Sequence, residues 1–400
     1  MPLTILHVSQ PVDGGVAQVV VDLLRGQIAD GHRVVLACPA DGARSEGRSA
    51  ATAAGGNRLA AAAAAAGAEV RHWAAVRSPA PGLRGEVAEL RRIVAEADPH
   101  LVHLHSSKAG LAGRLAVRGE RPTVFQPHAW SFAVGGATAP AARIWERWAT
   151  RWTDRLLCVS GQEQHEGEAA GLRARWALVP NGLDLDRFDP SVLPGQEQAR
   201  SLLDLDDEGP WAVCVGRLCR QKGQDVLLRA WAGVSTRVPG ARLALVGDGP
   251  DRAELEAQAA RLPDPDSVLF VGRSEDPRDW YAAADLLVLP SRWEGMALVP
   301  LEAMACARPV LLTDVAGARE SLLPEWPDPV PVDDPGALRE ALVARLADRE
   351  GCRGDGLAAR ALVVEKHDVR TTRSRVAALY QEVLTLRQDR CDHKDMTIAY

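Results

Sequence analysis

Two glutamates in the C-terminal half, Glu294 and Glu302, are spaced as two contacts to one ligand would be. Residues 285–289 are an apolar run that predicts a buried parallel strand, and the chain then turns through Glu294-Gly295 into an apolar helical segment. Eight residues of helix span about 12 Å at about 1.5 Å per residue. One carboxylate can therefore contact a ligand at the strand end while the other contacts a deeper part of it. Two solvated helix-end charges are the alternative, and neither glutamate is spaced like a metal clamp.

The turn that begins this helix, Gly295-Met296-Ala297-Leu298, adds a second feature suited to a ligand. The first N–H groups of a helix have no partner within it, and they carry a positive partial charge. A phosphate or a sugar hydroxyl would be stabilised at this position.

A basic pair precedes this stretch in the chain. The segment Trp211–Leu218 predicts a strand that breaks at Gly216 and carries Arg217 at its carboxyl end, and Lys222 precedes a helix predicted over residues 226–234. Arginine and lysine at this spacing can hold two phosphates, the arginine through a bidentate contact and the lysine as a point charge. An unpaired surface arginine is the alternative for Arg217.

The N-terminal half begins with a strand predicted over residues 3–8, a helix over 16–28 and a second strand over 31–38, which is the opening of a doubly wound domain. Gly14-Gly15 at the helix start allows close approach of the backbone to a ligand. These residues do not form a Gly-x-Gly-x-x-Gly fingerprint, so nicotinamide binding is only weakly indicated. Asp13 is either a ligand contact or a turn-forming residue.

Histidines lie at or near the ends of two further predicted strands. Residues 101–105 form one strand, which ends at His105 and leads into a helix with Lys108 in its first turn. Residues 122–132 form a strand that ends in a loop containing His128. In an α/β sheet, ligands bind at the carboxyl ends of the strands, where His105 and His128 are placed. For His103, on the apolar strand itself, we expect a core position.

Residues 143–155 predict an amphipathic helix with a stripe of three tryptophans and arginines beside it. Two interpretations stay open. The helix either packs its tryptophans on the sheet, which the strand predicted directly after it favours, or it lies on a membrane surface.

Composition places the chain among ordinary globular proteins. It has 400 residues, enough for two domains, with 46% hydrophobic and 25% charged residues. Net charge is −6, divided into about +4 for residues 1–180 and about −10 for the remainder. No basic cluster of a nucleic-acid-binding surface is evident. Seven cysteines without a Cys-x-x-Cys motif, and no apolar run long enough to span a membrane, predict reduced thiols and a cytoplasmic location.

Several of these stretches together resemble one known family. The segment 290–305, with Glu294-Gly295 and a following Leu-Glu-Ala-Met-Ala, resembles the donor-site motif of GT-B glycosyltransferases of the retaining family 4, or glycosyl transferases group 1, type. Residues 216–223, Gly-Arg-Leu-x-x-Gln-Lys-Gly, are similar to the pyrophosphate motif of these enzymes, and residues 105–110 and 181–188 also resemble family segments. Two departures are Met296-Ala297 after Glu-Gly and Ala316-Gly317 in place of Gly-Gly.

The resemblance implies an α/β fold of the GT-B type, in which two Rossmann-like doubly wound domains face each other across a cleft. We expect an acceptor-binding domain over residues 1–188, a nucleotide-sugar domain over 196–368, a helix over 369–388 that returns to the N-terminal domain, and a tail over 389–400. Residues 190–195 are the expected linker.

The resemblance also implies a retaining, metal-independent transfer of a sugar from a nucleotide-diphosphate sugar, with a UDP-sugar expected, to an acceptor hydroxyl. Catalytic roles fall on four residues: His128, Arg217, Lys222 and Glu294. Donor contacts fall on Gly14, Gly15, Gly216, Arg217, Lys222, Gly272, Arg273, Glu294, Gly295, Met296, Ala297, Leu298 and Glu302, and acceptor contacts on Asp13, His105 and Lys108. In the family, the histidine at the position of His128 faces the donor sugar. Glu302 would bind the ribose and Glu294 the sugar hydroxyls.

No cofactor and no metal are expected, and the acceptor is either a lipid-linked saccharide or a small molecule. A lipid-linked acceptor would make the protein peripheral at the inner face of the membrane. Two other functions are alternatives: a sugar-nucleotide epimerase, for which no carboxylate pair is identifiable in the N-terminal half, and a non-catalytic sugar-nucleotide-binding protein, against which Gly14-Gly15 and His128 argue.

Overall fold

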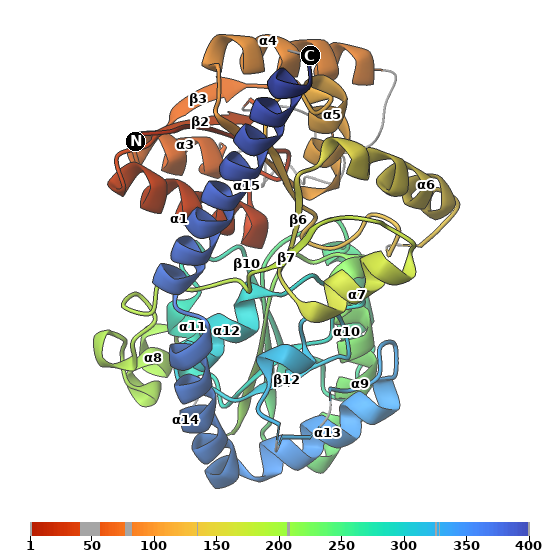
Figure 1. Ribbon diagram of the computed structural model, residues 1–400. Coiled ribbons are helices and arrows are strands. Elements are labelled where there is room, and N and C mark those ends of the chain that lie inside the picture. Colours follow the sequence, from red (N-terminus) through yellow and green to blue (C-terminus); the bar gives the residue numbers. More distant parts are fainter. Residues whose placement is uncertain are drawn as a thin grey trace. The chain divides into compact units, whose positions relative to one another are not determined.

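The computed structural model describes residues 2–40, 57–76, 82–133, 135–205, 209–324, 326–327 and 329–398. The chain divides into two compact units (Figure 1). The first unit runs to Asn181 and includes the residues from Val369 onwards, and the second contains Gly182–Asp368. Each unit is built on its own parallel sheet.

The first unit contains a seven-stranded sheet of order β3-β2-β1-β4-β5-β6-β7, and every pair of neighbouring strands is parallel. The strands are β1 (Thr4–Ser9), β2 (Arg33–Cys38), β3 (Glu69–His72), β4 (Leu101–His105), β5 (Thr123–Gln126), β6 (Arg155–Cys158) and β7 (Trp176–Leu178). The chain winds outwards from β1 to β3 and then resumes on the other side of β1 with β4. This reversal between β1 and β4 is a topological switch point, where α/β sheets bind their ligands.

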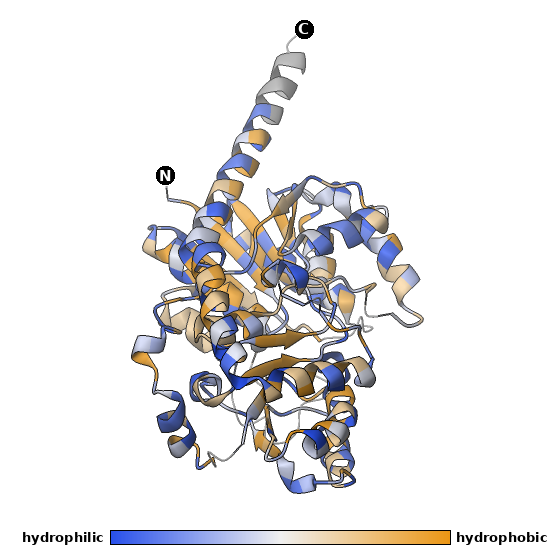
Figure 2. Cartoon of the chain, turned by 90° about the horizontal axis from the view of Figure 1, so that it is seen from below, coloured by the Kyte–Doolittle hydropathy of each residue, from blue (hydrophilic) through white to orange (hydrophobic). Residues whose placement is uncertain are grey.

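Both faces of this sheet are covered by helices, as the alternation along β2 shows. Val35 and Ala37 pack into one hydrophobic cluster, and Val34, Leu36 and Cys38 pack into another on the opposite face. The central strands are accordingly rich in apolar residues (Figure 2), whereas the edge strand β3 is Glu-Val-Arg-His. The helices of this unit are α1 (Gly14–Ala29), α3 (Arg58–Ala65), α4 (Leu83–Ala97), α5 (Ser106–Val117), α6 (Ala139–Ala149), η1 (Thr150–Trp152), α7 (Gly161–Ala169) and α15 (Val369–Ile398).

The second unit contains a five-stranded parallel sheet of order β10-β9-β8-β11-β12. Its strands are β8 (Trp211–Val215), β9 (Arg242–Val246), β10 (Val268–Gly272), β11 (Leu286–Leu289) and β12 (Val310–Leu312). Its helices are η2 (Pro190–Val192), α8 (Gln196–Leu202), η3 (Arg220–Lys222), α9 (Gln224–Arg237), α10 (Arg252–Ala259), η4 (Pro265–Ser267), α11 (Arg278–Ala283), α12 (Leu298–Ala305), η5 (Arg319–Ser321), α13 (Pro335–Ala347) and α14 (Arg349–Lys366). The switch point lies between β8 and β11, the two strands that precede the predicted donor motifs.

The boundary between the units differs from the predicted domain limits of 1–188 and 196–368. Residues 182–195 belong to the second unit. Leu183 explains this placement, because its N–H donates to His367 O at 2.7 Å and it forms a bridge with Asp368, just after α14. Residues 190–195, predicted as a free linker, include the short helix η2, whose Asp189 cap accepts a hydrogen bond from Ser191 N.

The C-terminal helix is longer than predicted. Instead of ending at residue 388 before a tail, α15 continues to Ile398. Residues 389–398 contain neither glycine nor proline, so nothing in them ends a helix. Within the first unit, α15 packs beside α1, where Arg373 Nε donates to Asp22 O at 2.7 Å.

The tryptophan stripe predicted over residues 143–155 lies on α6 and η1. Its rings pack mainly on one another, with centroid separations of 4.3–6.4 Å among Trp145, Trp148 and Trp152. Only Glu146 and Ala149 of α6 are buried, while Trp148 is 40% exposed and Ile144 is 66% exposed. The tryptophans therefore pack mainly on one another and not on the sheet, where one of the two interpretations had placed them.

Glu146 anchors α6 to the core through a buried ion pair with Arg114 of α5, at 2.7 Å between Oε2 and Nη2. Both side chains are almost completely buried, and Arg114 also donates to Gly110 O. Glu146→Ala would leave the guanidinium buried without its counter-charge, so we expect the free energy of unfolding to fall by about 3–5 kcal/mol. Urea denaturation measures this, with Glu96→Ala, which breaks an exposed pair with Arg92, as the control. Equal effects of the two substitutions would contradict the prediction.

Within the described residues, no helix is both long and apolar enough to cross a membrane. Six buried cysteines form no disulfide: Cys38, Cys158, Cys214, Cys219, Cys306 and Cys352.

Candidate functional site

The loop between β11 and α12, which carries Glu294, is held against the loop after β8 by a set of hydrogen bonds. Arg292 N donates to Gln221 O at 2.8 Å, and Gln221 Nε2 donates to Trp293 O at 3.0 Å. The Arg292 guanidinium contacts both carboxylate oxygens of Asp225 at 2.8 and 2.7 Å and Asp333 at 2.7 Å. The two loops at the switch point of the second unit are thus fixed relative to one another.

Lys222 and Glu294 face each other across these two loops. Lys222 Nζ lies 2.6 Å from Glu294 Oε1, and Ser291 Oγ donates to the same oxygen at 2.7 Å. The lysine side chain is 18% exposed and the glutamate 10%. The pair is therefore partly desolvated but open to a ligand, and a charged group of either sign can be held there. Sequence reasoning placed both residues at the site but missed Ser291.

Arg217 lies beside this pair in the chain and is exposed. Its backbone carbonyl accepts a hydrogen bond from Gln224 Nε2 at 3.1 Å, but its guanidinium makes no hydrogen bond or ion pair in the described part of the chain. An arginine that follows a strand at a switch point, with all its donors available, is suited to bind an anion.

Glycines bring the ends of β8, β9 and β10 into backbone contact. Gly216 N donates to Val246 O at 2.9 Å, and Gly247 N donates to Gly272 O at 2.8 Å. A Cβ on Gly247 would lie 1.9 Å from Gly216 O, so only glycine fits there. This packing brings Gly216 and Gly272, both predicted donor contacts, to the same edge of the sheet. Arg273 follows Gly272 and is partly exposed.

Helix α12 begins with Ala297 at its N-cap, and no side chain there accepts a hydrogen bond from the first turn. Met296 and Leu298 are each 6% exposed. The preceding Gly295 lies against Gly317, where φ is +76° and a Cβ would lie 2.7 Å from Gly295 O. Glycine at position 317 thus allows the close approach of the turn before α12.

Glu302, the second glutamate, lies within α12 and accepts a hydrogen bond from the Tyr281 hydroxyl at 2.5 Å. Burial and the neighbouring carboxylate raise the pKa of Tyr281 well above its usual value, so the hydroxyl remains a donor. Tyr281 orients Glu302, and sequence reasoning missed it because an aromatic residue in the apolar helix α11 looks like core.

In the first unit, Asp13 and the two glycines after it are exposed at the start of α1. Asp13 occupies the N-cap without a side-chain capping bond, and Gly14 has a φ of +73° with open space around its Cβ position. The geometry leaves the Asp13 carboxylate and the first turn of α1 accessible.

Lys108 has a different environment from the one expected of an acceptor contact. Its ammonium lies 2.7 Å from Glu86 Oε2 of α4, and the two side chains are 5% and 4% exposed. Contact between Lys108 and an acceptor would require this buried pair to open, so the observed role of Lys108 is to join α4 and α5.

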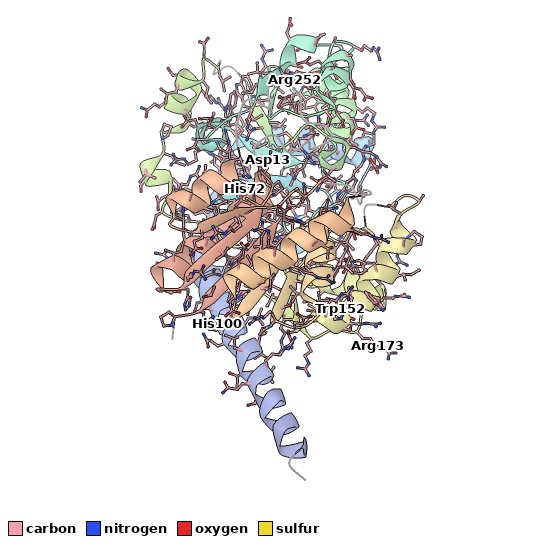
Figure 3. The ribbon with its side chains drawn as sticks, turned by 90° about the horizontal axis from the view of Figure 1, so that it is seen from above. Asp13, His72, His100, Trp152, Arg173 and Arg252 are labelled. Atoms are coloured by element: carbon pink, nitrogen blue, oxygen red, sulfur yellow. The ribbon has the colours of Figure 1, made fainter. Side chains whose placement is uncertain are left out.

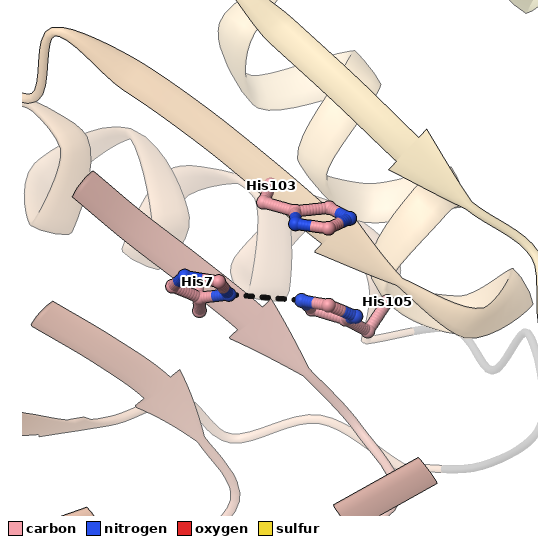
Figure 4. Close-up of side chains that lie close together, drawn as sticks. All are labelled: His7, His103 and His105. Atoms are coloured by element: carbon pink, nitrogen blue, oxygen red, sulfur yellow. Dashed lines mark hydrogen bonds between the residues drawn. The ribbon is translucent and has the colours of Figure 1, made fainter. Parts of the chain in front are cut away.

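Four histidines lie close together at the switch point of the first unit. The strand register places His7 beside His103 on β1 and β4 (Figure 4). His7 Nδ1 lies 2.9 Å from His105 Nε2, and His105 Nδ1 lies 3.2 Å from His128 Nε2. His103, which we expected in the core, is fully buried, with Nδ1 2.6 Å from the Tyr380 hydroxyl. Sequence reasoning missed His7 as a member of this group.

Three of these rings, His7, His103 and His105, have nitrogen atoms within 4.8 Å of one another, a spacing that a metal ion could also use. The hydrogen bond between His7 and His105 engages one nitrogen of each ring (Figure 4). The observed distances are those of hydrogen-bonded imidazoles.

Backbone geometry is unusual at the outer end of this group. His128 and Ala129 have φ values of +54° and +100°, which non-glycine residues rarely adopt. Ala129 N donates to Glu163 Oε1 at 2.6 Å, and this bond to the buried Glu163 of α7 holds the turn. Strained backbone that the surroundings hold in place is common at functional sites.

The histidine group predicts a loss of stability in mild acid. Burial lowers the pKa of His7 to about 4 and of His128 to about 3, and it lowers the pKa of His103 and His105 well below the usual 6.5. Between pH 6.5 and about 4 the unfolded chain binds more protons than the folded one. The free energy of unfolding should therefore fall as pH decreases through this window, by up to about 1.4 kcal/mol per pH unit for each histidine. Urea denaturation from pH 7 to 4.5 measures the slope, which His128→Asn should reduce; an unchanged slope would contradict the prediction.

Comparison with known proteins agrees with the two-unit architecture. The family model for Glycosyltransferase Family 4 matches residues 13–187, and the model for glycosyl transferases group 1 matches residues 209–348. The chain is 32% identical over 324 residues to the GDP-mannose-dependent alpha-(1-6)-phosphatidylinositol monomannoside mannosyltransferase of Mycolicibacterium smegmatis, covering 78% of this chain and 83% of that protein. It is 34% identical to the lipopolysaccharide core biosynthesis mannosyltransferase LpsB of Rhizobium meliloti over 51% of this chain and 59% of that protein.

Among solved structures, Anabaena Alr3699/HepE in complex with UDP and glucose matches with a TM-score of 0.79 at 22% identity, over 95% of this chain and all of that one. The two parallel sheets and the match to HepE show the GT-B fold, as predicted. The matched family model identifies the chain as a glycosyltransferase. The chain belongs to glycosyltransferase family 4. The relatives cited are named as transferases, so neither an epimerase nor a non-catalytic binding protein is favoured.

Proposed function

We propose that this enzyme is a retaining, metal-independent hexosyltransferase that moves a sugar from a nucleotide-diphosphate sugar to an acceptor hydroxyl. The observation that carries the donor assignment is the Lys222–Glu294 pair, set between the loops at the β8/β11 switch point. Arg217 and the first turn of α12 provide further positive potential next to it. A diphosphate placed there would meet fixed positive groups without a metal.

In the proposed reaction, the bond between the anomeric carbon and the diphosphate oxygen breaks, and a bond to the acceptor oxygen forms on the same face of the sugar. Positive charge develops on the sugar ring and negative charge on the leaving diphosphate. Lys222 and Arg217 stabilise the leaving group, and Glu294 accepts hydrogen bonds from the sugar hydroxyls. The proton of the acceptor hydroxyl passes to an oxygen of the leaving diphosphate, so no separate protein base is needed.

Glu302 and the Gly272-Arg273 turn are the proposed contacts of the nucleoside. Tyr281 donates to one oxygen of Glu302 and so orients the carboxylate, which is the proposed acceptor of hydrogen bonds from the ribose hydroxyls. Arg273, at the end of β10, is the proposed neighbour of the base.

The donor is proposed to be GDP-mannose. The Mycolicibacterium smegmatis relative is named as GDP-mannose-dependent, and the Rhizobium meliloti relative is named as a mannosyltransferase. A UDP-sugar, which we expected from the sequence, is the second candidate because HepE was solved with UDP and glucose.

A ligand screen tests this proposal. GDP-mannose, UDP-glucose, ADP-glucose and a dTDP-sugar are added separately, and the thermal midpoint and donor hydrolysis are measured for the wild type and for Arg217→Ala. A rise in the midpoint with one nucleotide sugar, together with slow hydrolysis and loss of both effects in the variant, supports the proposal. Absence of any shift at millimolar donor would overturn it.

The acceptor is proposed to be a saccharide or polyol on a lipid, reached at an anionic membrane surface. A cavity of about 600 Å³ at the edge of the first unit is lined by five arginines and one carboxylate. They are Arg118, Arg151, Arg173, Arg175, Arg387 and Asp154. The carboxylate is already engaged by Arg387, through bonds of 2.8 Å to both its oxygens, so four arginines remain to attract anions.

Two features place this cavity next to a surface suited to lipid. Trp152, which lines the cavity together with Arg173, follows α6 directly (Figure 3). On α6, Ile144 and Trp148 are exposed. Exposed apolar side chains next to uncompensated arginines are typical of a helix that lies on an anionic membrane.

Vesicle sedimentation provides the test. We expect the enzyme to bind vesicles that contain phosphatidylserine or phosphatidylinositol and not vesicles of phosphatidylcholine alone. Arg173→Ala/Arg175→Ala should weaken this binding about thirtyfold, since each basic residue contributes about 1 kcal/mol at such a surface. Arg237→Ala/Arg339→Ala, which removes two exposed arginines from the second unit, is the matched control. Equal binding by both double variants would contradict the membrane assignment.

A further inference from the structure

The histidine group of the first unit contains a directed chain of hydrogen bonds that starts at an amide. Gln27 of α1 lies with Oε1 2.8 Å from His7 Nε2. From there the contacts run from His7 Nδ1 to His105 Nε2 and from His105 Nδ1 to His128 Nε2. Gln27, His7 and His105 are all buried, and His128 is partly exposed.

An amide oxygen only accepts hydrogen bonds, and this fixes the protons of every ring that follows. A neutral imidazole has one N–H donor and one acceptor nitrogen. His7 must therefore carry its proton on Nε2, which makes Nδ1 an acceptor. His105 then donates from Nε2 and accepts at Nδ1, and His128 donates from Nε2. Burial, which keeps these rings neutral, maintains the order.

The other end of the Gln27 amide lies towards Tyr380. Its Nε2 faces the Tyr380 hydroxyl at 3.5 Å, and that hydroxyl lies 2.6 Å from His103 Nδ1. The amide thus donates towards Tyr380, and Tyr380 donates to His103. With the amide reversed, the protons along His7, His105 and His128 would all move to the opposite nitrogens.

We propose that Gln27 sets the tautomer of His128 through His7 and His105, so that His128 presents Nδ1 as a hydrogen-bond acceptor to a ligand hydroxyl. No described residue bonds to His128 Nδ1, and the ring is at the carboxyl end of β5. A hydroxyl of a sugar or polyol fits this acceptor, whereas a phosphate or carboxylate oxygen does not. Gln27, His7 and His105 are positioning residues. The identity of the ligand rests on the proposed function, whereas the tautomer is inferred from the contacts alone.

The tautomer itself is measured without any assay of activity. Nitrogen-15 NMR of the full chain with labelled histidine, with His128→Asn used for assignment, shows which ring nitrogen of each residue carries the proton. We expect His7, His105 and His128 to be protonated at Nε2 in the wild-type enzyme at pH 7. Protonation of His128 at Nδ1 would overturn the proposal, whether or not the enzyme transfers sugar.

Substitutions of Gln27 test the control that it exerts. Gln27→Glu keeps an acceptor opposite His7 and should preserve both the His128 tautomer and activity. Gln27→Leu removes the acceptor, and we expect a mixture of His128 tautomers and a fall of about tenfold in kcat/KM, the value of one weakened hydrogen bond. Gln18→Leu, on the same helix and hydrogen-bonded to Asp22, is the matched control.

Two results would contradict the control by Gln27. One is an unchanged His128 tautomer in Gln27→Leu, and the other is equal loss of activity in Gln27→Glu and Gln27→Leu. Should Gln27→Leu fold poorly, the wild-type spectrum and Gln27→Glu still decide the question.

Discussion

Lys222→Ala should lower kcat for sugar transfer by about 10²–10³-fold, the range expected when one fixed donor to a developing negative charge is removed. The expectation follows from the position of the lysine. Its side chain is mostly buried, and the 18% that remains exposed is accessible to a ligand. Water in that partly closed site cannot replace the lost charge. Steady-state transfer or hydrolysis of the best donor measures the effect.

The matched control is Lys366→Ala, which removes an exposed lysine at the end of α14. It should leave kcat within a factor of two. Denaturation curves for both variants exclude unfolding as the cause of any loss. Retention of activity within about threefold in Lys222→Ala would remove Lys222 from the proposed catalytic group.

The central strands of both sheets were predictable because they are largely apolar runs, and the strand over residues 101–105 has the predicted bounds. The edge strand β3, Glu-Val-Arg-His, is not an apolar run and was not predicted. Helix α14 was not predicted, since Gly351, Gly354 and Gly356 lower helix propensity in its first half. It forms because Cys352, Ala359 and Val363 are buried on one face and because Gly356 lies close to Ala307, where a Cβ would be 2.2 Å from a carbonyl oxygen. Tertiary packing thus overrides the local preference.

The candidate site shows the same division between local and distant information. Glu294, Glu302 and Lys222 were predicted from motif spacing, which is local, and their roles stay predictions. Tyr281 was missed because it contacts Glu302 from another helix, 21 residues away, whereas Ser291, three residues before Glu294, is a local contact that the motif did not single out. The Lys108–Glu86 ion pair also joins two helices, across 22 residues, and the acceptor contact expected of Lys108 stays a prediction.

The histidine chain depends even more on distant information. His7 lies on β1, His105 on β4 and His128 after β5. These histidines become neighbours in space because the strands lie in the order β1-β4-β5 in the sheet. A histidine on an apolar strand looks like an isolated core residue until the strand beside it is known. Gln27, which is proposed to orient the hydrogen bonds of the histidines, lies on α1 in a stretch without a recognisable motif.

Glu302→Gln should weaken donor binding by about 10–100-fold, because the neutral amide replaces one carboxylate oxygen by a donor, and hydrogen bonds to a charged group contribute about 1.5–3 kcal/mol. Isothermal titration with the preferred nucleotide measures the change. Tyr281→Phe should have a smaller effect in the same direction, since it frees one oxygen of Glu302 but no longer holds the carboxylate in place. Glu365→Ala, on the exposed face of α14, is the control.

A second nucleotide shows whether the ribose is the group that Glu302 binds. If it is, a 2′,3′-dideoxy nucleotide should bind the wild type weakly, and Glu302→Gln should cost little further affinity with that ligand, as a double-mutant cycle requires of two groups in contact. If the substitution costs the same affinity with both nucleotides, Glu302 acts by supporting α12 through Tyr281 instead. The cycle thus separates a carboxylate that contacts the donor from one that only supports helix α12.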